Sequence, residues 1–143
     1  MATNDAGAAL QKAIYDALSA QIEAPSPPVA VGLYDYVDEN ASYPYIVIGE
    51  STIVDDGNKT SFGQDHTFTL HVWDQNTDNR TGRLRAREIM GLIYEALHEK
   101  SLTVEGQSLV LCKFDFSSGP DFDADGKTVH GVTRYRIKTQ PST

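Results

Sequence analysis

Residues 66–73, HTFTLHVW, decide the fold class because apolar and polar side chains alternate strictly along them. Phe68, Leu70 and Val72 share one face of a strand with this period. The other face carries four residues: Thr67, Thr69, His71 and Trp73. Such a strand packs one face on a core and leaves the other for solvent or a partner. The stretch therefore predicts a sheet that is covered on one side.

Two further strands are predicted upstream of this stretch. Residues 29–37 (VAVGLYDYV) and 45–50 (YIVIGE) are rich in β-branched and aromatic residues. Residues 51–63 are polar and contain Asp55-Asp56-Gly57, where Asp-Gly favours a chain reversal. We expect this segment to form an exposed hairpin loop.

Two amphipathic helices are predicted, over residues 5–22 and 78–99. Apolar residues recur in both at helical spacing. Thr77 or Asp78 can cap the second helix. Gly91 inside it costs about 1 kcal/mol relative to Ala, which is tolerable if the helix packs closely there.

The chain after the second helix predicts more strands, at residues 102–104, 109–116 and 129–138, with a loop at 117–127. The predicted order is α-β-β-β-α-β-β-β. Short connections favour antiparallel pairing in a single, partly mixed sheet of five to six strands. We expect an α+β fold with both helices on one sheet face, in a single domain over residues 1–143.

The composition excludes several classes of protein. A formal net charge of −8 argues against general nucleic-acid binding, which needs excess Lys and Arg, but it suits a protein past which DNA slides without sticking. No stretch approaches the roughly 20 apolar residues that span a bilayer, and residues 1–9 show no signal-peptide pattern. Cys112 is the only cysteine, which excludes an internal disulfide and predicts a packed free thiol.

The best candidate metal motif is Asp121-x-Asp123-x-Asp125-Gly126, which matches the opening of a calcium-binding EF-hand loop. The bidentate Glu that should close such a loop is replaced by Val132, inside a predicted strand. Two interpretations remain: a solvated turn, or a weak calcium site in a calcium-dependent binding module.

The sequence contains no recognisable catalytic motif. His66 and His71 have opposite parity on one strand, so they cannot chelate a metal together. His130 lies near either of them only if its strand is adjacent. A small enzyme with residues assembled from distant segments stays a third hypothesis.

Four arginines crowd the first predicted turns of the second helix, where the positive end of the helix dipole disfavours cations. They are Arg80, Arg83, Arg85 and Arg87. One interpretation is a solvated face neutralised by nearby carboxylates: Asp74, Asp78 and Glu88. The other is a face, formed by Arg80, Arg83 and Arg87, that pairs with acidic loops of a neighbouring subunit in a head-to-tail ring. The candidate acidic partners are Asp55-Asp56 and residues 121–125.

Trp73 and His71 make the polar face of residues 66–73 unusually amphipathic. Aromatic residues are favoured at protein interfaces. This face is therefore predicted either to contact another subunit or to be covered by the second helix.

Four segments spread in order over nearly the whole chain carry a family pattern. They are residues 40–50 (NASYPYIVIGE), 66–74 (HTFTLHVWD), 87–99 (REIMGLIYEALHE) and 125–139 (DGKTVHGVTRYRIKT). The pattern resembles the tail-terminator or tail-completion proteins of long-tailed, siphovirus-like phages and gene transfer agents. It consists of core strands and helices and includes no catalytic signature.

The resemblance implies a homohexameric ring that caps the tail tube and joins it to the head connector. Its implied partners are further copies, the major tail tube protein and the connector or stopper protein, with DNA passing through the lumen. It implies a virion protein made in the bacterial cytoplasm, with no catalysis, no cofactor and no membrane. A head-side stopper or adaptor in the same neck is the alternative of the same class.

Overall fold

The computed structural model describes residues 3–79 and 81–142. One mixed five-stranded sheet has the order β1-β2-β3-β5-β4, in which β1 pairs parallel with β2 and the other pairs are antiparallel. The α+β prediction is thereby confirmed. The elements are α1 (Gly7–Glu23), β1 (Gly32–Tyr34), β2 (Tyr45–Asp55), β3 (Gln64–Gln75), α2 (Leu84–Leu97), β4 (Gln107–Phe122) and β5 (Thr128–Pro141).

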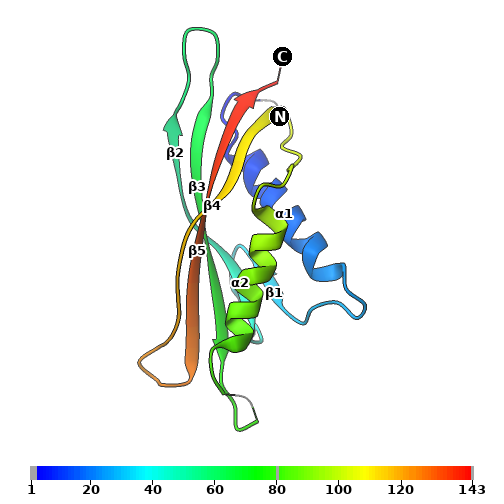
Figure 1. Ribbon diagram of the computed structural model, residues 1–143, viewed down its shortest axis with the longest axis vertical. Helices are drawn as coiled ribbons and strands as arrows, with labels where there is room; N and C mark the ends of the chain where they lie inside the picture. The colour runs from blue at the N-terminus through cyan, green and yellow to red at the C-terminus, as the bar shows by residue number, and fades with distance from the viewer. Residues whose placement is uncertain (1–2, 80, 143) are drawn as a thin grey trace.

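Both helices lie on the same side of the sheet (Figure 1). Phe68, Leu70 and Val72 are buried beneath them, as their alternation predicts. We call this side the covered face, and we call the side that carries Thr67, Thr69, His71 and Trp73 the open face. Neither helix of the described chain is long and apolar enough to cross a membrane.

Cys112 lies on the covered face, opposite Ile137 of β5, and is buried in the core. Burial alone raises the pKa of its thiol to about 11. A thiol that stays protonated near neutral pH is a poor nucleophile. The prediction of a packed free thiol is confirmed.

The second helix begins later than predicted, at Leu84, with Arg83 at the N-cap. The predicted caps Thr77 and Asp78 therefore lie outside it. Gly82 has φ +103°, outside the right-handed helical region, so the helix cannot extend back through it. The helix ends at Leu97, close to the predicted boundary.

Two predicted strands differ from the structure. Residues 102–104 form no strand, because the chain turns there through a hydrogen bond from Gln107 N to Val104 O (3.0 Å) while Val104 is buried in the core. The strand predicted at 29–37 shrinks to β1. The Val29 amide donates to Ile22 O at 2.9 Å, so its backbone closes the exit from α1 and does not extend a sheet ladder.

Two predicted loops are partly strands. The β2–β3 ladder runs out to Asp55 and Gln64, although most side chains along β2 beyond Gly49 are exposed. The β4–β5 ladder reaches Phe122 opposite Val129 through a bulge after Ser118. Backbone hydrogen bonds sustain both extensions, and neither has the alternating burial that a sequence pattern can register.

Candidate assembly surfaces

The β2–β3 hairpin projects past the helices and forms one end of the molecule (Figure 1). We call residues 53–63 the arm. Its turn is closed by backbone hydrogen bonds from Asp56 N to Gly63 O (2.9 Å) and from Asn58 N to Ser61 O (2.9 Å). The arm is therefore an ordered hairpin.

The arm combines exposed apolar side chains with carboxylates. Phe62 is 69% exposed, and Ile53 and Val54, which precede the turn on β2, are exposed as well. Asp55 and Asp56 flank the turn, and Asp56 lies 3.5 Å from Lys138 Nζ. Apolar side chains gathered on a projecting hairpin mark an interaction surface.

The arginines at the start of α2 do not form one surface. Arg80 lies outside the described residues. The Arg83 guanidinium lies 4.4 Å from the ring centroid of Phe122, a cation–π contact. Arg85 pairs through two nitrogens with Asp74, which is 2% exposed. Arg87 is exposed, so these described arginines have three different environments.

Asp74 thus neutralises Arg85, in agreement with one part of the solvated-face interpretation. The hydrogen bond to Asp74 raises the pKa of Arg85. Because the carboxylate is buried, the pair holds the start of α2 against the end of β3. Arg85 is a structural residue in the monomer, unlike Arg87.

The two predicted acidic partners lie at different ends of the molecule. The arm and the start of α2 occupy opposite ends, while the β4–β5 turn shares the end with α2 (Figure 1). The cation–π contact between Arg83 and Phe122 holds the start of α2 beside the end of β4. Asp55 and Asp56 therefore cannot reach Arg83 or Arg87 of their own chain.

The open face carries a hydrogen-bonded chain that links three strands. His71 Nε2 lies 2.7 Å from Glu50 Oε1, and His71 Nδ1 lies 2.8 Å from His130 Nε2. The His130 ring stacks on Trp73 at 3.8 Å between centroids. Gly49 makes room, because a Cβ there would lie 2.5 Å from the His71 ring. No helix of the described residues covers this face, so the prediction that α2 covers Trp73 is wrong.

Two members of this hydrogen-bonded chain, Glu50 and His130, have lowered pKa values for different reasons. The hydrogen bond from His71 lowers the pKa of Glu50. Burial, and then the charge of His71, lowers the pKa of His130. The His130 ring stacked on Trp73 forms a flat aromatic platform suited to a protein contact. No sequence pattern indicated Glu50. His130 was expected near His71 only if their strands were adjacent, which they are.

The acidic turn at residues 121–126 is stabilised internally. Asp125 Oδ1 accepts the amides of Lys127 (2.9 Å) and Thr128 (2.7 Å), and its Oδ2 accepts the Thr128 hydroxyl (2.5 Å). These bonds, led by the Thr128 hydroxyl, lower the pKa of Asp125 to about 2. Across residues 3–79 and 81–142, no group of three or more His, Cys, Asp or Glu side chains is arranged to hold a metal ion.

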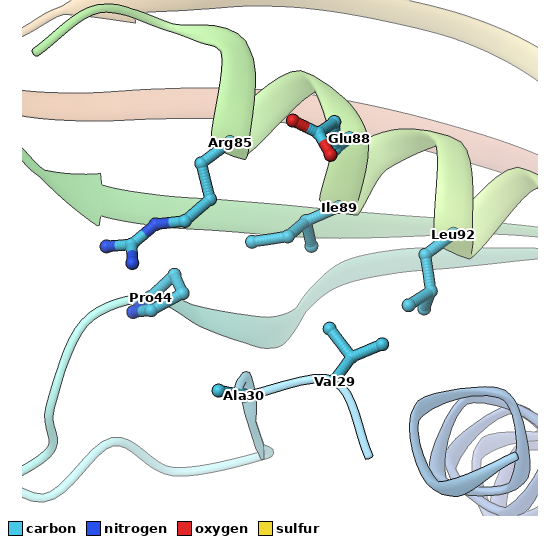
Figure 2. Close-up of a pocket in the computed structure, with 7 residues that line it drawn as sticks. All are labelled: Val29, Ala30, Pro44, Arg85, Glu88, Ile89 and Leu92. Carbon is cyan, nitrogen blue, oxygen red and sulfur yellow. The ribbon is translucent and has the colours of Figure 1, made fainter. Parts of the chain in front are cut away.

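Two cavities flank the first half of α2. One, of about 330 Å³, lies between the helix and the chain around Ala30 and Pro44. Figure 2 shows Ile89 and Leu92 pointing into it, with Arg85 reaching toward Pro44. The other, of about 250 Å³, lies between the helix and strands β4 and β5. Its lining includes Arg87, Gly91, Tyr94, Phe114, Ser117 and Tyr135.

Gly91 does not serve close packing of α2, contrary to the sequence-based expectation. A Cβ built at Gly91 would meet no atom within 4 Å. Gly131 on β5 is the opposite case, because its Cβ would lie 2.6 Å from Met90 Sδ. The close approach of α2 to the sheet is thus made at Gly131, and Gly91 leaves the second cavity open.

The comparisons with known proteins identify the class as a structural protein of phage tails. A family model described as Tail completion protein gp17 matches residues 12–140. The chain belongs to this family, which confirms the family resemblance and the expected location in the virion, at the tail end of the particle.

One relative in sequence and two solved structures illustrate the match. Tail completion protein gp17 of Bacillus phage SPP1 is 36% identical over 95 residues, which span 66% of this chain and 66% of that protein, just under two thirds. A solved structure of bacteriophage SPP1 gp17 covers 90% of this chain and 89% of its own, with a TM-score of 0.55 and 28% identity. A chain in the virion of a native gene transfer agent particle shares the fold, with a TM-score of 0.77, 19% identity and coverage of 96% and 99%.

Proposed function

We propose that this tail completion protein forms a closed homohexameric ring that caps the tail tube and joins it to the head connector. The observation that carries the proposal is the placement of the acidic arm and the start of α2, where Arg83 and Arg87 lie, at opposite ends of one chain (Figure 1). A surface and its complement on different parts of a protomer generate a head-to-tail contact, and such contacts form a closed ring when the rotation between successive copies closes. The role is structural and uses no catalysis or cofactor.

The contact residues that we propose are Arg83 and Arg87 on one copy against Asp55 and Asp56 on the next. Arg80 belongs to the same proposal, although it lies outside the described residues. Asp121, Asp123 and Asp125 are weaker candidates, because their turn lies beside Arg83 in the same chain. Arginine suits this contact, since its planar guanidinium pairs with carboxylates through two parallel hydrogen bonds.

We assign the open face, with Trp73 at its centre, to contacts with the tube protein or the connector. Two aromatic platforms support this assignment: Trp73 stacked on His130, and Tyr43 stacked on Tyr45 at 5.2 Å between centroids. Flat aromatic surfaces are frequent anchors of protein interfaces.

We propose further that DNA passes through the ring without specific binding. Two basic residues of β5 support this idea, because each is paired within the chain: Arg134 with Asp115 (2.7 Å) and Arg136 with Asp65 (2.7 Å). Cations already paired with carboxylates neutralise few phosphates.

Mass photometry of the purified chain tests the ring. We expect a species of six chains, and we expect Arg87→Glu or Arg83→Glu to reduce it at least tenfold. The matched charge reversal Lys100→Glu, at an exposed site beyond the end of α2, should leave it intact. Asp55→Arg with Asp56→Arg should restore assembly to the Arg87→Glu chain. A stable monomer at high concentration would contradict the proposal.

Electron microscopy tests the place of the ring. Incubated with tubes of the particle's tail tube protein, the chain should appear as a single cap at one tube end. Trp73→Ala should lose the cap while keeping the ring, because Trp73 lies at the other end of β3 from the arm and on the sheet face opposite to α2. Binding along the whole tube would contradict the terminator role.

A further inference from the structure

Gly91 is the starting point, because the monomer gives no reason for it. The residue sits inside α2, where glycine is a poor helix former. Its missing side chain accommodates no atom of its own chain within 4 Å. Glycine at such a place is used where another backbone or ligand approaches closely.

The cavity beside Gly91 has the chemistry of a receptor for an aromatic side chain with a carboxylate next to it. Arg87, Gly91 and Tyr94 line it from one face of the helix, at i, i+4 and i+7. Phe114 forms edge-on contacts with both Tyr94 (5.6 Å between centroids) and Tyr135 (5.7 Å). These three rings line the cavity, so the walls of the cavity are aromatic. Arg87 is the cation of its lining.

Tyr135 adds an independent observation. This side chain is fully buried and lines the cavity. Its hydroxyl makes no hydrogen bond of normal geometry among the described residues. Burial raises its pKa, and Thr133, which also lines the cavity, lies near enough to oppose that shift in part. A buried hydroxyl without a partner is costly, and an occupant with an acceptor would remove that cost.

The arm is the matching element. Phe62 is its most exposed large apolar residue, at 69%. Asp56 lies beside Phe62 across the hairpin, because its amide bonds to Gly63 O at 2.9 Å. The arm therefore presents one aromatic ring with carboxylates next to it. A cavity of about 250 Å³ accommodates one such ring.

We propose that the arm of a second copy docks in the cavity beside Gly91, with Phe62 between its aromatic walls and Asp55 or Asp56 on Arg87. The arm of the same chain lies at the other end of the molecule (Figure 1), so the occupant is another copy. The inference rests on the proposed ring and names its anchor. Each copy offers one arm and one cavity, so the contact repeats around the ring.

Filling the cavity tests the proposal without weakening the fold. Gly91→Gln places a good helix former where the structure has open space, so its melting temperature should equal or exceed that of the wild type. Assembly in mass photometry should fall at least tenfold. The matched control Ala30→Gln adds a side chain of the same length to the cavity on the other flank of α2 and should assemble normally. Loss of assembly by Ala30→Gln but not by Gly91→Gln would overturn the proposal.

Cysteine pairing tests which segments meet. The native Cys112 is buried and its pKa is raised to about 11, so it gives a silent background. Chains carrying Ser61→Cys on the arm are mixed with chains carrying Ser117→Cys, which lines the cavity, and are oxidised gently. A disulfide needs Cα atoms within about 7 Å. We expect covalent dimers that contain one chain of each kind.

Ser118→Cys is the matched control for this pairing. Ser118 lies opposite Val132, on the open face, one residue from Ser117. It should give no dimer with Ser61→Cys. A dimer with Ser118→Cys alone, or between two Ser61→Cys chains, would overturn the docking proposal.

The two proposals fail differently. If the wild-type chain forms no oligomer under any condition, the proposed ring fails. If the wild type and Gly91→Gln form the same ring, the ring stands and the docking of the arm at Gly91 is wrong.

Discussion

The two faces of the sheet are stabilised in different ways. On the covered face, apolar side chains pack under α1 and α2, with residues such as Leu70 and Ile137 fully buried. On the open face, side chains mostly contact one another, as in the ion pair of Arg136 with Asp65 and the contact of His71 with His130. The covered face thus holds the monomer together, and the open face is available to partners. Substitutions matched across the sheet separate these roles.

Truncation of a core side chain should give the largest difference. Leu70→Ala on the covered face should lower the free energy of unfolding by about 2–5 kcal/mol, because it removes buried surface and leaves a cavity. Thr67→Ala, on the open face of the same strand, loses its contact with Thr52 (2.5 Å) and should cost less than about 1 kcal/mol. Urea titration measures both values. Equal losses would show that the open face is also packed in the monomer.

Glycine substitution gives the next largest difference. Gly131→Ala should cost about 1–3 kcal/mol through overpacking, because its Cβ would lie 2.6 Å from Met90 Sδ beneath α2. Gly49→Ala also meets a side chain, the His71 ring at 2.5 Å. To make room, the His71 ring would leave its contacts with Glu50 and His130, and the Cβ would also lie 3.2 Å from Thr69 O. The stability loss should still be smaller than at Gly131, because no helix of the described residues packs over this ring, and the His71 resonances should shift in NMR spectra. A larger stability loss at Gly49 would reverse the comparison.

Sequence periodicity predicted the covered face because burial there alternates with the strand. It predicted β3 and the core of α2 for the same reason. The sequence indicated the exposed hairpin at the arm, but its periodicity missed the strand pairing at the base of the arm and at the end of β4, where strands continue with both faces exposed and leave no periodic signal. The strand wrongly predicted at residues 102–104 shows the opposite failure. Val104 is apolar and buried, but it lies in a turn and not in a strand.

The open-face site was predicted only in part, because it depends on register. The alternation of residues 66–73 indicated Trp73 and His71 as a face in need of explanation. The pairing of Trp73 with His130 required the order β3-β5, which no local pattern encodes. Glu50 reaches His71 near the irregularity between Ile48 and Ser51 in β2. Bulges of this kind re-aim side chains and have weak sequence signatures.

Breaking one ion pair on each face should give a smaller difference in the free energy of unfolding. Asp74→Asn should lower the free energy of unfolding by about 1–3 kcal/mol, because the buried site would keep Arg85 without its carboxylate. The open-face change Asp65→Asn breaks a more exposed pair with Arg136 and should change stability little. Urea titration at low and at 0.5 M salt separates them, since only the exposed pair should respond to salt. A larger loss at Asp65 would contradict this assignment.

The loss of stability at acid pH should differ least between the two faces of the sheet. Burial lowers the pKa of His66 on the covered face and of His130 on the open face. Asp5 and Asp65 oppose the shift at His66, while Asp123 and Glu50 oppose it at His130. Below the ordinary value of 6.5, the unfolded chain binds protons that the folded chain does not. Stability should therefore fall as pH falls through 6.5 toward the folded pKa values.

Carboxylates do not disturb this window. The lowered pKa values of Glu50 and Asp125 make stability fall only below their ordinary values of 4.5 and 3.8. Urea titrations at about pH 7.5 and pH 5.5 therefore isolate the histidines, whose ordinary pKa is near 6.5. His66→Gln should reduce the loss between these two pH values more than His130→Gln does, because His66 is fully buried whereas water reaches part of His130. If His130→Gln reduces the loss more, the open face is the less hydrated of the two in solution, as it would be inside an assembled ring.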